Sequence, residues 1–341
     1  MFDLLLLTGV VGSFLVNLPG RMDGDELFVR YFLALILILS FFIAPKREIK
    51  SVPLGVFLLI ALASVFASYR VPVIGVFKEV LLGLLAVKVI AERTTIRSYE
   101  LGLPLTVFWL FFNVLLLAQG FGSVLKGWEL AGTFVMPWMM GSAACLSIPF
   151  VKKWKKEWCL MLLPAVLLSH STACFAIALL MYVYPIKFTQ RKLYVTLASL
   201  GALLVAYVLI FDFSFELTRF QVMFNSFPHC HNWITGNGIG SWLHMAFYRM
   251  NGITPTHWTT AHNLYYQVFF EMGILGLLAL LAVLLALWVK SYGSCRTALL
   301  GVLMLNLVHP VAHFPRFSVF LVILTAMILK DDGLKEVPDA H

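Results

Sequence analysis

The stretch that decides the fold begins at His262, ends at Lys290 and reads HNLYYQVFFEMGILGLLALLAVLLALWVK. Its apolar part, residues 263–289, contains a single charged residue, Glu271. A helix needs about 20 apolar residues to cross a bilayer. We therefore expect residues 263–289 to form a membrane-spanning helix, with His262 at its entrance.

The composition places the rest of the chain in the same class. Of the 341 residues, 61% are hydrophobic and 12% are charged, and the mean hydropathy is +0.90. Soluble domains are roughly half apolar and a quarter charged. The sequence therefore predicts an all-α, polytopic membrane protein that forms a single integral membrane domain over residues 1–341.

The basic residues and the cysteines argue against a nucleic-acid-binding protein and against a disulfide-stabilised protein. The net charge is +8, but the basic residues fall in short clusters between apolar runs, which is typical of topology signals rather than of a nucleic-acid-binding face. The five cysteines are scattered and include no CxxC pair, so they do not predict a disulfide framework. Residues 2–18 lack the basic segment and cleavage pattern of a signal peptide, and we interpret them as the first span.

Polar or basic loops separate about twelve apolar segments, several of which are shorter than a full upright span. The segments are residues 2–18, 30–44, 53–68, 72–91, 101–121, 130–150, 157–170, 172–186, 192–212, 263–289, 296–311 and 315–329.

The basic residues predict how these spans are oriented. If the N-terminus is cytoplasmic, the clustered cations lie in the cytoplasmic loops, as the positive-inside rule requires. These loops hold Lys46, Arg47, Lys50, Arg93, Arg97, Lys152, Lys153, Lys155, Lys156, Lys187, Arg191, Lys192, Lys290 and Arg296. The opposite short loops hold only Arg21, Arg30, Arg70, Lys126 and Arg316. The long hydrophilic loop, residues 213–261, is therefore expected outside, and both termini are expected in the cytoplasm.

The loop at 213–261 carries most of the unusual polar residues and one glycine run. The polar residues are Arg219, His229, His231, His244, Arg249 and His257. The run is Gly236-Asn237-Gly238-Ile239-Gly240, and it follows no predicted strand, so a dinucleotide site is not predicted. Either it is a tight turn whose backbone amides approach a ligand, or it is a flexible loop whose glycines adopt positive φ.

His262 is the candidate residue for chemistry, because an imidazole titrates near neutral pH and is suited to proton transfer. We expect Thr259, Thr260 or Asn263 to cap the helix that begins here. The positive end of that helix would disfavour the imidazolium and keep a neutral base available. The alternative is an interfacial histidine that only hydrogen-bonds to the loop.

Helical spacing places several residues on the face of His262. At about 100° per residue, Tyr266, Phe269, Gly273 and Gly276 share that face, while Glu271 lies on the far side. We therefore expect that Glu271 is not the carboxylate partner of His262. The two glycines would let another helix approach closely.

These residues resemble the O-antigen ligase and polymerase superfamily of bacterial envelope glycosyltransferases. The ligase pattern H-[NSQ]-x9-G-x-x-[GTY] is matched by His262, Asn263, Gly273 and Gly276. Members of the superfamily are multispanning inner-membrane enzymes of the GT-C type with one large periplasmic loop. The resemblance does not separate a ligase from a polymerase or a protein O-oligosaccharyltransferase.

The resemblance implies transfer of a glycan from an undecaprenyl-diphosphate carrier to an acceptor hydroxyl on the periplasmic face. The acceptor would be a lipid A core or a growing glycan, and no metal or other cofactor would be needed. His262 would be the base, and Arg219 would hold the diphosphate, because a guanidinium is permanently charged and binds phosphate oxygens in pairs. The further candidates for substrate binding are Asn263, Arg249, Arg70, Gly236, Gly238 and Gly240.

One element departs from the superfamily. Its members often carry a Ser-Arg-Gly-Ala-like element between two short spans in mid-chain, where this chain has Ser169-His170-Ser171-Thr172-Ala173. The arginine is absent. Three explanations are open: His170 or another outer-side cation replaces it, the substrate is held differently, or the chain has lost activity.

A metal-dependent membrane hydrolase is the second class of function. His229, Cys230 and His231, together with His257 and His262, would supply nitrogen and sulfur ligands for zinc. The chain lacks an H-E-x-x-H motif near them.

A transporter is the third class. Lys78 and Glu79 lie inside a predicted span, where charges often serve function, but adjacent helical residues do not face each other. The chain has no internal repeat of the transporter kind, and its polar residues concentrate in one loop. His309 and His313 lie one helical turn apart, which is compatible with a proton relay or an interhelical hydrogen bond.

Overall fold

The computed structural model describes residues 2–15, 23–49, 52–67, 74–123, 137–169, 171–184, 221–242, 261–308 and 315–330. Every regular element in these ranges is helical, and none of the ranges contains a strand. The expected all-α fold is confirmed.

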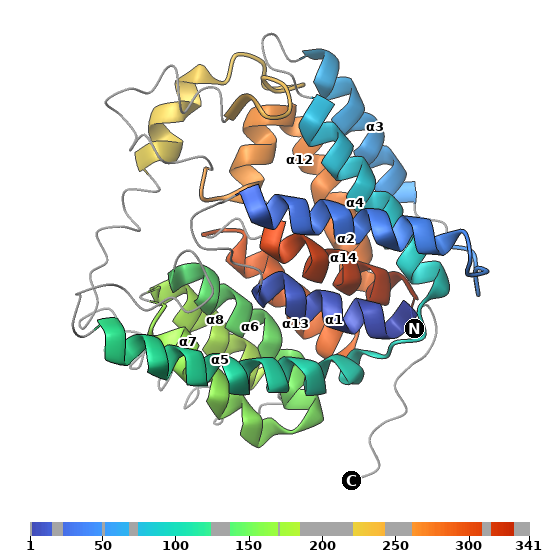
Figure 1. Ribbon diagram of the computed structural model, residues 1–341. Helices are drawn as coiled ribbons and strands as arrows, with labels where there is room; N and C mark the ends of the chain where they lie inside the picture. Colours follow the sequence, from blue (N-terminus) through green and yellow to red (C-terminus); the bar gives the residue numbers. More distant parts are fainter. Residues whose placement is uncertain are drawn as a thin grey trace, which may run out of the picture.

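The helices form a bundle with α14 at its centre (Figure 1). In chain order they are α1 (Phe2–Leu15), α2 (Asp23–Ser40), α3 (Val52–Ala67), α4 (Ile74–Arg93), η1 (Ser98–Leu101), α5 (Gly102–Ser123), α6 (Pro137–Trp154), η2 (Lys156–Leu162), α7 (Leu163–Leu167), α8 (Thr172–Val183), η3 (Phe227–His229), α12 (Leu264–Lys290), α13 (Gly293–Leu305) and α14 (Pro315–Lys330). Helix α14 packs against α1, α2, α4, α12 and α13, whereas α6 gathers α5, α8 and α13 around it. Most side chains of α14 are buried, as expected for a helix that is hydrophobic all round.

An aromatic cluster joins the two groups of helices. It consists of Phe14, Phe108, Trp109, Phe112, Phe150, Phe317 and Phe320, whose ring centroids lie 5.1 to 6.2 Å from their neighbours. The indole Nε1 of Trp109 donates a hydrogen bond to Ser147 Oγ at 2.9 Å. This bond satisfies the polar atom of a fully buried ring and fixes α5 against α6.

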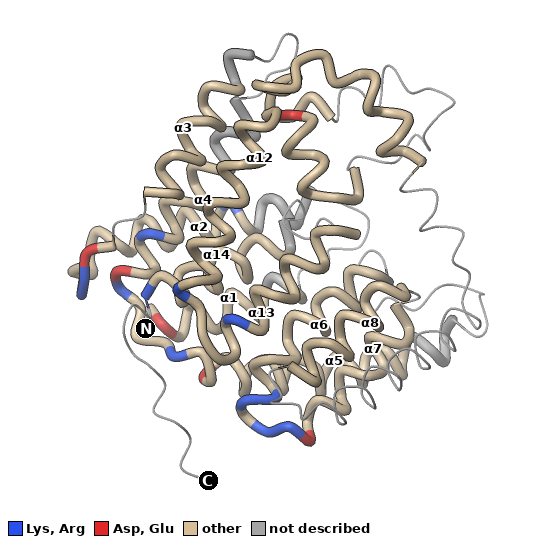
Figure 2. Tube along the Cα trace, turned by 180° about the vertical axis from the view of Figure 1, so that it is seen from behind, with Lys and Arg blue, Asp and Glu red and all other residues tan. Residues whose placement is uncertain are grey.

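Most of the Lys and Arg residues that the structure describes lie at one end of this bundle, along one edge of Figure 2. Chain segments far apart in sequence meet there. Lys330 Nζ donates to Ile96 O at 2.6 Å, Arg47 Nη1 donates to Lys330 O at 2.7 Å, and Thr94 Oγ1 donates to Asp3 Oδ1 at 2.7 Å. The first residues of α1 and the last residue of α14 therefore lie at the same end. Among the cations whose side chains the structure describes, Arg30 lies away from this end, because it is in the middle of α2.

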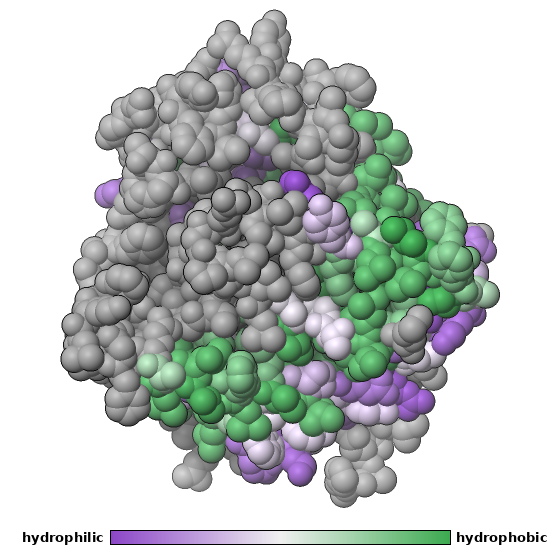
Figure 3. Space-filling view, in the orientation of Figure 1, coloured by the Kyte–Doolittle hydropathy of each residue, from purple (hydrophilic) through white to green (hydrophobic). Residues whose placement is uncertain are grey.

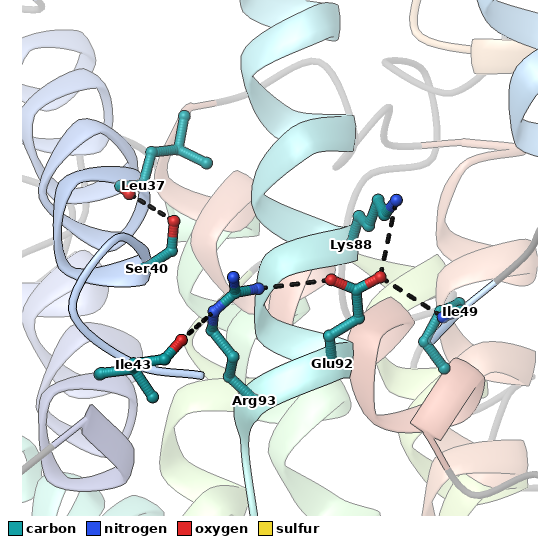
Figure 4. Close-up of polar contacts among 7 residues, drawn as sticks. All are labelled: Leu37, Ser40, Ile43, Ile49, Lys88, Glu92 and Arg93. Atoms are coloured by element: carbon teal, nitrogen blue, oxygen red, sulfur yellow. Dashed lines mark hydrogen bonds and ion pairs between the residues drawn. The ribbon is translucent and has the colours of Figure 1, made fainter. Parts of the chain in front are cut away.

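Glu92 holds this basic end together (Figure 4). The buried carboxylate accepts from Arg93 Nη1 at 3.3 Å and from the Ile49 amide at 3.4 Å, and it lies 3.6 Å from Lys88 Nζ. Arg93 Nε also donates to Ile43 O at 2.8 Å. A carboxylate with two cations and an amide around it is compensated for its burial, so the segment that follows α2 is fixed on the end of α4.

One expected span is wrong. Residues 157–170 were predicted as one segment, but the chain forms the 3-10 helix η2 and then the five-residue helix α7. Pro164 has no amide hydrogen, so the helical bond that would join η2 to α7 at this position cannot form. The expected segment at 192–212 lies outside the described residues.

Within the described residues, two helical segments are long and apolar enough to cross a membrane, Ser98–Ala118 and Leu264–Lys290. Six apolar segments of the described residues are shorter, namely Phe2–Gly12, Val29–Ser40, Val52–Ser64, Thr172–Val183, Gly293–Leu305 and Phe317–Lys330. Two of the described helices could thus cross a membrane by length and composition, and the expected number of about twelve spans stays a prediction.

Candidate functional site

Helix α12 begins where we expected, and Asn263 is its cap. The Oδ1 atom of Asn263 accepts from the Tyr266 amide at 2.9 Å, which satisfies one of the free amides of the first turn. The Nδ2 atom donates to Leu307 O at 3.0 Å, and the Leu264 amide donates to Asn306 O at 2.9 Å. The start of α12 is therefore fastened to the end of α13. The Asn263 amide, expected to bind substrate, makes structural bonds with both of its polar atoms.

His262 directly precedes this cap and has an uncommon backbone conformation. Its φ is +55°, and among the described residues it is the only one other than glycine with a positive φ. A residue with a Cβ loses stability in the left-handed region, and such residues concentrate at functional sites. The side chain is half-buried. The structure thus places the candidate base at a sharp change of chain direction, directly before the start of α12, which is fastened to the end of α13.

Helix α12 is broken at Gly273. The φ and ψ of this residue are +65° and −167°, so the helix ends before it and restarts after it. A break of this kind frees carbonyl groups on one side and amides on the other, and buried groups of both types need partners.

The segment from Trp233 to Gly238 supplies those partners. The amides of Asn237 and Gly238 donate to Phe270 O at 3.0 Å and Glu271 O at 2.8 Å. On the other side of the break, Ile274 N donates to Trp233 O at 2.8 Å and Leu275 N donates to Ile234 O at 3.3 Å. We call residues 232–242 the bridging loop, because they satisfy both halves of the broken helix.

All three glycines of the bridging loop adopt positive φ angles. This is the conformation named in the second of the two interpretations of the glycine run, a loop whose glycines adopt positive φ. The φ angles of Gly236, Gly238 and Gly240 are +75°, +99° and +81°. Their amides donate within the chain, to Asn232 O, Glu271 O and the Glu271 carboxylate. The bonds of Gly238 and Gly240 hold the loop against α12, whereas contact of these glycines with a ligand stays a prediction.

Glu271 is the hub of the site. Its side chain is buried, and Oε2 accepts from the Gly240 amide at 2.9 Å. Oε1 accepts from the Trp242 amide at 3.3 Å and from Gln267 Nε2 at 3.2 Å. These contacts agree with our expectation that Glu271 is not the partner of the His262 imidazole.

The expectation about the motif glycines needs a correction. A Cβ atom on Gly273 would overlap the backbone of Ile234 and lie 2.6 Å from Gly236 N, and one on Gly276 would overlap Met272 of its own helix. The bridging loop, not another helix, therefore approaches Gly273. The helical face deduced for His262 also needs a correction, because His262 precedes the cap of α12 with φ of +55° and Gly273 interrupts the helix.

The His229-Cys230-His231 segment is part of the packing of this region. Cys230 is buried in an apolar cluster with Val222, Trp242, Ala261 and Phe270, and burial raises the pKa of its thiol. The Asn237 side chain bridges the flanking histidines, since it donates to His229 O and accepts from the His231 amide, both at 3.0 Å. Within the described ranges, no group of three or more His, Cys, Asp and Glu residues is placed to hold a metal. His257 lies outside those ranges.

Several other predicted residues also lie outside the described residues. They are Arg219, Arg249, Arg70, His170, His309 and His313. Lys78 and Glu79 belong to α4, but the structure describes only their backbone. The neighbours of His170 are ordered around the start of α8, where Ser171 Oγ accepts from the Cys174 amide at 3.2 Å.

Sequence reasoning missed Asn237 and Gln267 and gave Glu271 no role. Gln267 and Glu271 are four residues apart in a helix, and this spacing predicts that they can touch. The other partners of Glu271 lie on the bridging loop, about 30 residues earlier in the chain, and no local pattern identifies them. Gln267 in addition accepts from the Ala261 amide.

Comparison with known proteins gives no assignment. The chain matches no protein-family model and no curated protein.

Proposed function

We propose that this chain is an integral protein of the bacterial inner membrane. The support is the apolar outer surface of its helices, which forms broad areas in Figure 3. Helix α5 has no charged residue, and its large side chains at Leu103, Val107, Leu110, Phe111, Val114 and Leu117 are exposed. In the most apolar 18-residue stretch of α12, only 33% is buried against the rest of the protein. Exposed apolar areas of this extent need a nonaqueous surrounding.

The proposed orientation places the basic end in the cytoplasm and the bridging loop in the periplasm. Its support is the gathering of Lys and Arg at the end that holds Asp3 and Lys330, as the positive-inside rule describes. Helix α12 ends at Lys290, one of the cations of the basic end. Its start, Leu264, therefore lies at the opposite end of the bundle.

Reporter fusions test this orientation. A fusion at Gly252, in the loop 213–261, should have periplasmic activity, and a fusion at Trp154, beside the Lys152 to Lys156 cluster, should have cytoplasmic activity, because the basic cluster is retained inside. Alkaline phosphatase and green fluorescent protein report the two compartments. The same compartment at both positions would contradict the orientation.

Within this frame we propose that the chain is a metal-independent glycosyltransferase of the O-antigen ligase or polymerase type. An acceptor hydroxyl oxygen attacks the anomeric carbon of the lipid-linked glycan, and His262 takes the hydroxyl proton. As the new carbon–oxygen bond forms, the bond from that carbon to the diphosphate breaks. Undecaprenyl diphosphate leaves with the electron pair, and Arg219 stabilises its charge.

One observation carries this proposal. Two residues of the H-N-x9-G-x-x-G pattern, His262 and Gly273, have positive φ angles of +55° and +65°. Within residues 261–290 they are the two positions with positive φ. The bridging loop holds one of them directly. A motif whose positions coincide with strained backbone is typical of a functional site.

Chelation tests the proposed chemistry. Purified protein in lipid vesicles, given a glycan on undecaprenyl diphosphate, should release undecaprenyl diphosphate at an unchanged rate after treatment with EDTA, because cationic side chains take the place of a metal at the diphosphate. Lipid A core and a second lipid-linked glycan are supplied as acceptors in separate reactions. Product on the first acceptor identifies a ligase, and product on the second a polymerase.

Two results would oppose the proposal in different ways. Loss of transfer on chelation with rescue by zinc would assign the region to a metal enzyme that uses His229 and His231. Passage of the intact lipid-linked glycan across the vesicle membrane, without release of undecaprenyl diphosphate, would identify a transporter.

A further inference from the structure

We infer that Gln267 is a positioning residue that sets the backbone conformation of His262. This inference rests on the proposed function, in which His262 is the base. Gln267 is buried in the first turns of α12, with 4% of its surface exposed. Its Oε1 atom accepts from the Ala261 amide at 3.3 Å, and its Nε2 atom donates to Glu271 Oε1 at 3.2 Å.

These bonds fix the chain on the N-terminal side of His262. Ala261 is fully buried in the cluster with Trp242 and Phe270, so its amide has Gln267 as the acceptor that replaces water. On the C-terminal side, Asn263 is fixed by the cap and by Leu307. His262 is thus the single residue between two fixed neighbours, and its left-handed φ is the conformation that joins them.

The orientation of Gln267 is itself set by Glu271. A side-chain amide has a donor end and an acceptor end. The donor end of Gln267 faces Glu271 Oε1, and the acceptor end is therefore directed at the Ala261 amide. Glu271 is in turn held by the Gly240 and Trp242 amides. A continuous set of hydrogen bonds therefore joins the bridging loop to the backbone of the proposed base.

This geometry makes a prediction for Gln267→Met. Methionine has a similar length and adapts to irregular gaps, but it cannot accept from Ala261 or donate to Glu271. Because loss of a residue that orients a functional side chain costs about 10–100-fold in activity, kcat should fall by that factor. KM should change by less than about threefold, since a residue that only orients the base acts on the step after binding.

Two companion variants separate positioning from general loosening. Tyr265→Phe removes the 3.0 Å bond from Tyr265 Oη to Leu303 O, which fastens the same turn of α12 through another side chain. It should leave kcat within about twofold, because the bonds of Gln267 to Ala261 and Glu271 remain. Gln267→Glu keeps the acceptor for Ala261, and two adjacent carboxyl groups share a proton that replaces the bond to Glu271. Its kcat should stay within about threefold of wild type.

A double-mutant cycle with His262→Ala completes the test, with all rates expressed per mole of folded protein. If Gln267 acts through His262, Gln267→Met should lower the residual activity of His262→Ala by less than about twofold. Wild-type kcat in Gln267→Met, an equal loss in Tyr265→Phe, or a full additional loss in the double variant would overturn the inference. The proposed function would survive each of these results, whereas undiminished transfer by His262→Ala alone would remove it.

Discussion

Replacement of Gly273 by leucine is expected to remove most of the folded protein. The leucine Cβ would overlap the backbone of Ile234. The φ of +65° and ψ of −167° at this position belong to a region that is essentially restricted to glycine and costs other residues about 1–3 kcal/mol. Overpacking adds about 1–3 kcal/mol. If the bridging loop moves away, the carbonyls of Phe270 and Glu271 also lose their partners. Since native proteins are stable by only about 5–15 kcal/mol, these losses together are severe.

Gly55→Leu is the matched control for this variant. Gly55 lies in α3, where an added Cβ would meet nothing within 4 Å, so leucine there should be tolerated. The amount of protein in the membrane fraction and its thermal unfolding in detergent are the measurements. Equal amounts and equal unfolding temperatures for the two variants would contradict the fit of the bridging loop to the broken helix.

Much of the frame could be predicted from sequence because it depends on local patterns. The apolar run at 263–289 identifies α12 within one residue at each end, since Asn263 is a strong N-cap and Ser291 follows the last helical residue. The clusters of Lys and Arg likewise anticipate the end at which Asp3 and Lys330 both bond to residues 94–96. Hydrophobic length and charge clusters are properties of one segment at a time.

The site itself could be predicted only in part, because it depends on contacts between distant segments. Gly273 lies inside a run that is otherwise a strong helix former, and the break becomes stable only when Trp233, Ile234, Asn237 and Gly238 satisfy the freed backbone groups. Regular spacing therefore assigned the wrong neighbour to this glycine. The placement of His262 and Glu271 on separate sides stays a prediction, because His262 precedes the cap of α12 with φ of +55° and regular helical spacing does not extend to it.

Loss of the imidazole at position 262 is expected to have the largest effect on activity. A positioned general base contributes about 10²–10⁴-fold to a rate, so His262→Ala should reduce glycan transfer by that factor. The residue is only half-buried, and the cap, the break and the bonds of Glu271 do not use its side chain. The variant should therefore accumulate in the membrane like the wild type.

His262→Asn separates the imidazole from the backbone conformation. Asparagine tolerates the left-handed region well, so this variant should keep the geometry between Ala261 and Asn263 while it lacks the base. We expect its transfer rate to fall as far as that of His262→Ala. A rate near that of wild type in His262→Asn, with loss only in His262→Ala, would assign a structural role to position 262.

The most direct test of the account is the rate at which wild-type protein and these two variants, each purified and inserted into vesicles, release undecaprenyl diphosphate in the presence of acceptor. The account predicts release by the wild type and a decrease of about 10²–10⁴-fold in both variants, at equal amounts of folded protein. Release by His262→Ala at the wild-type rate would contradict it.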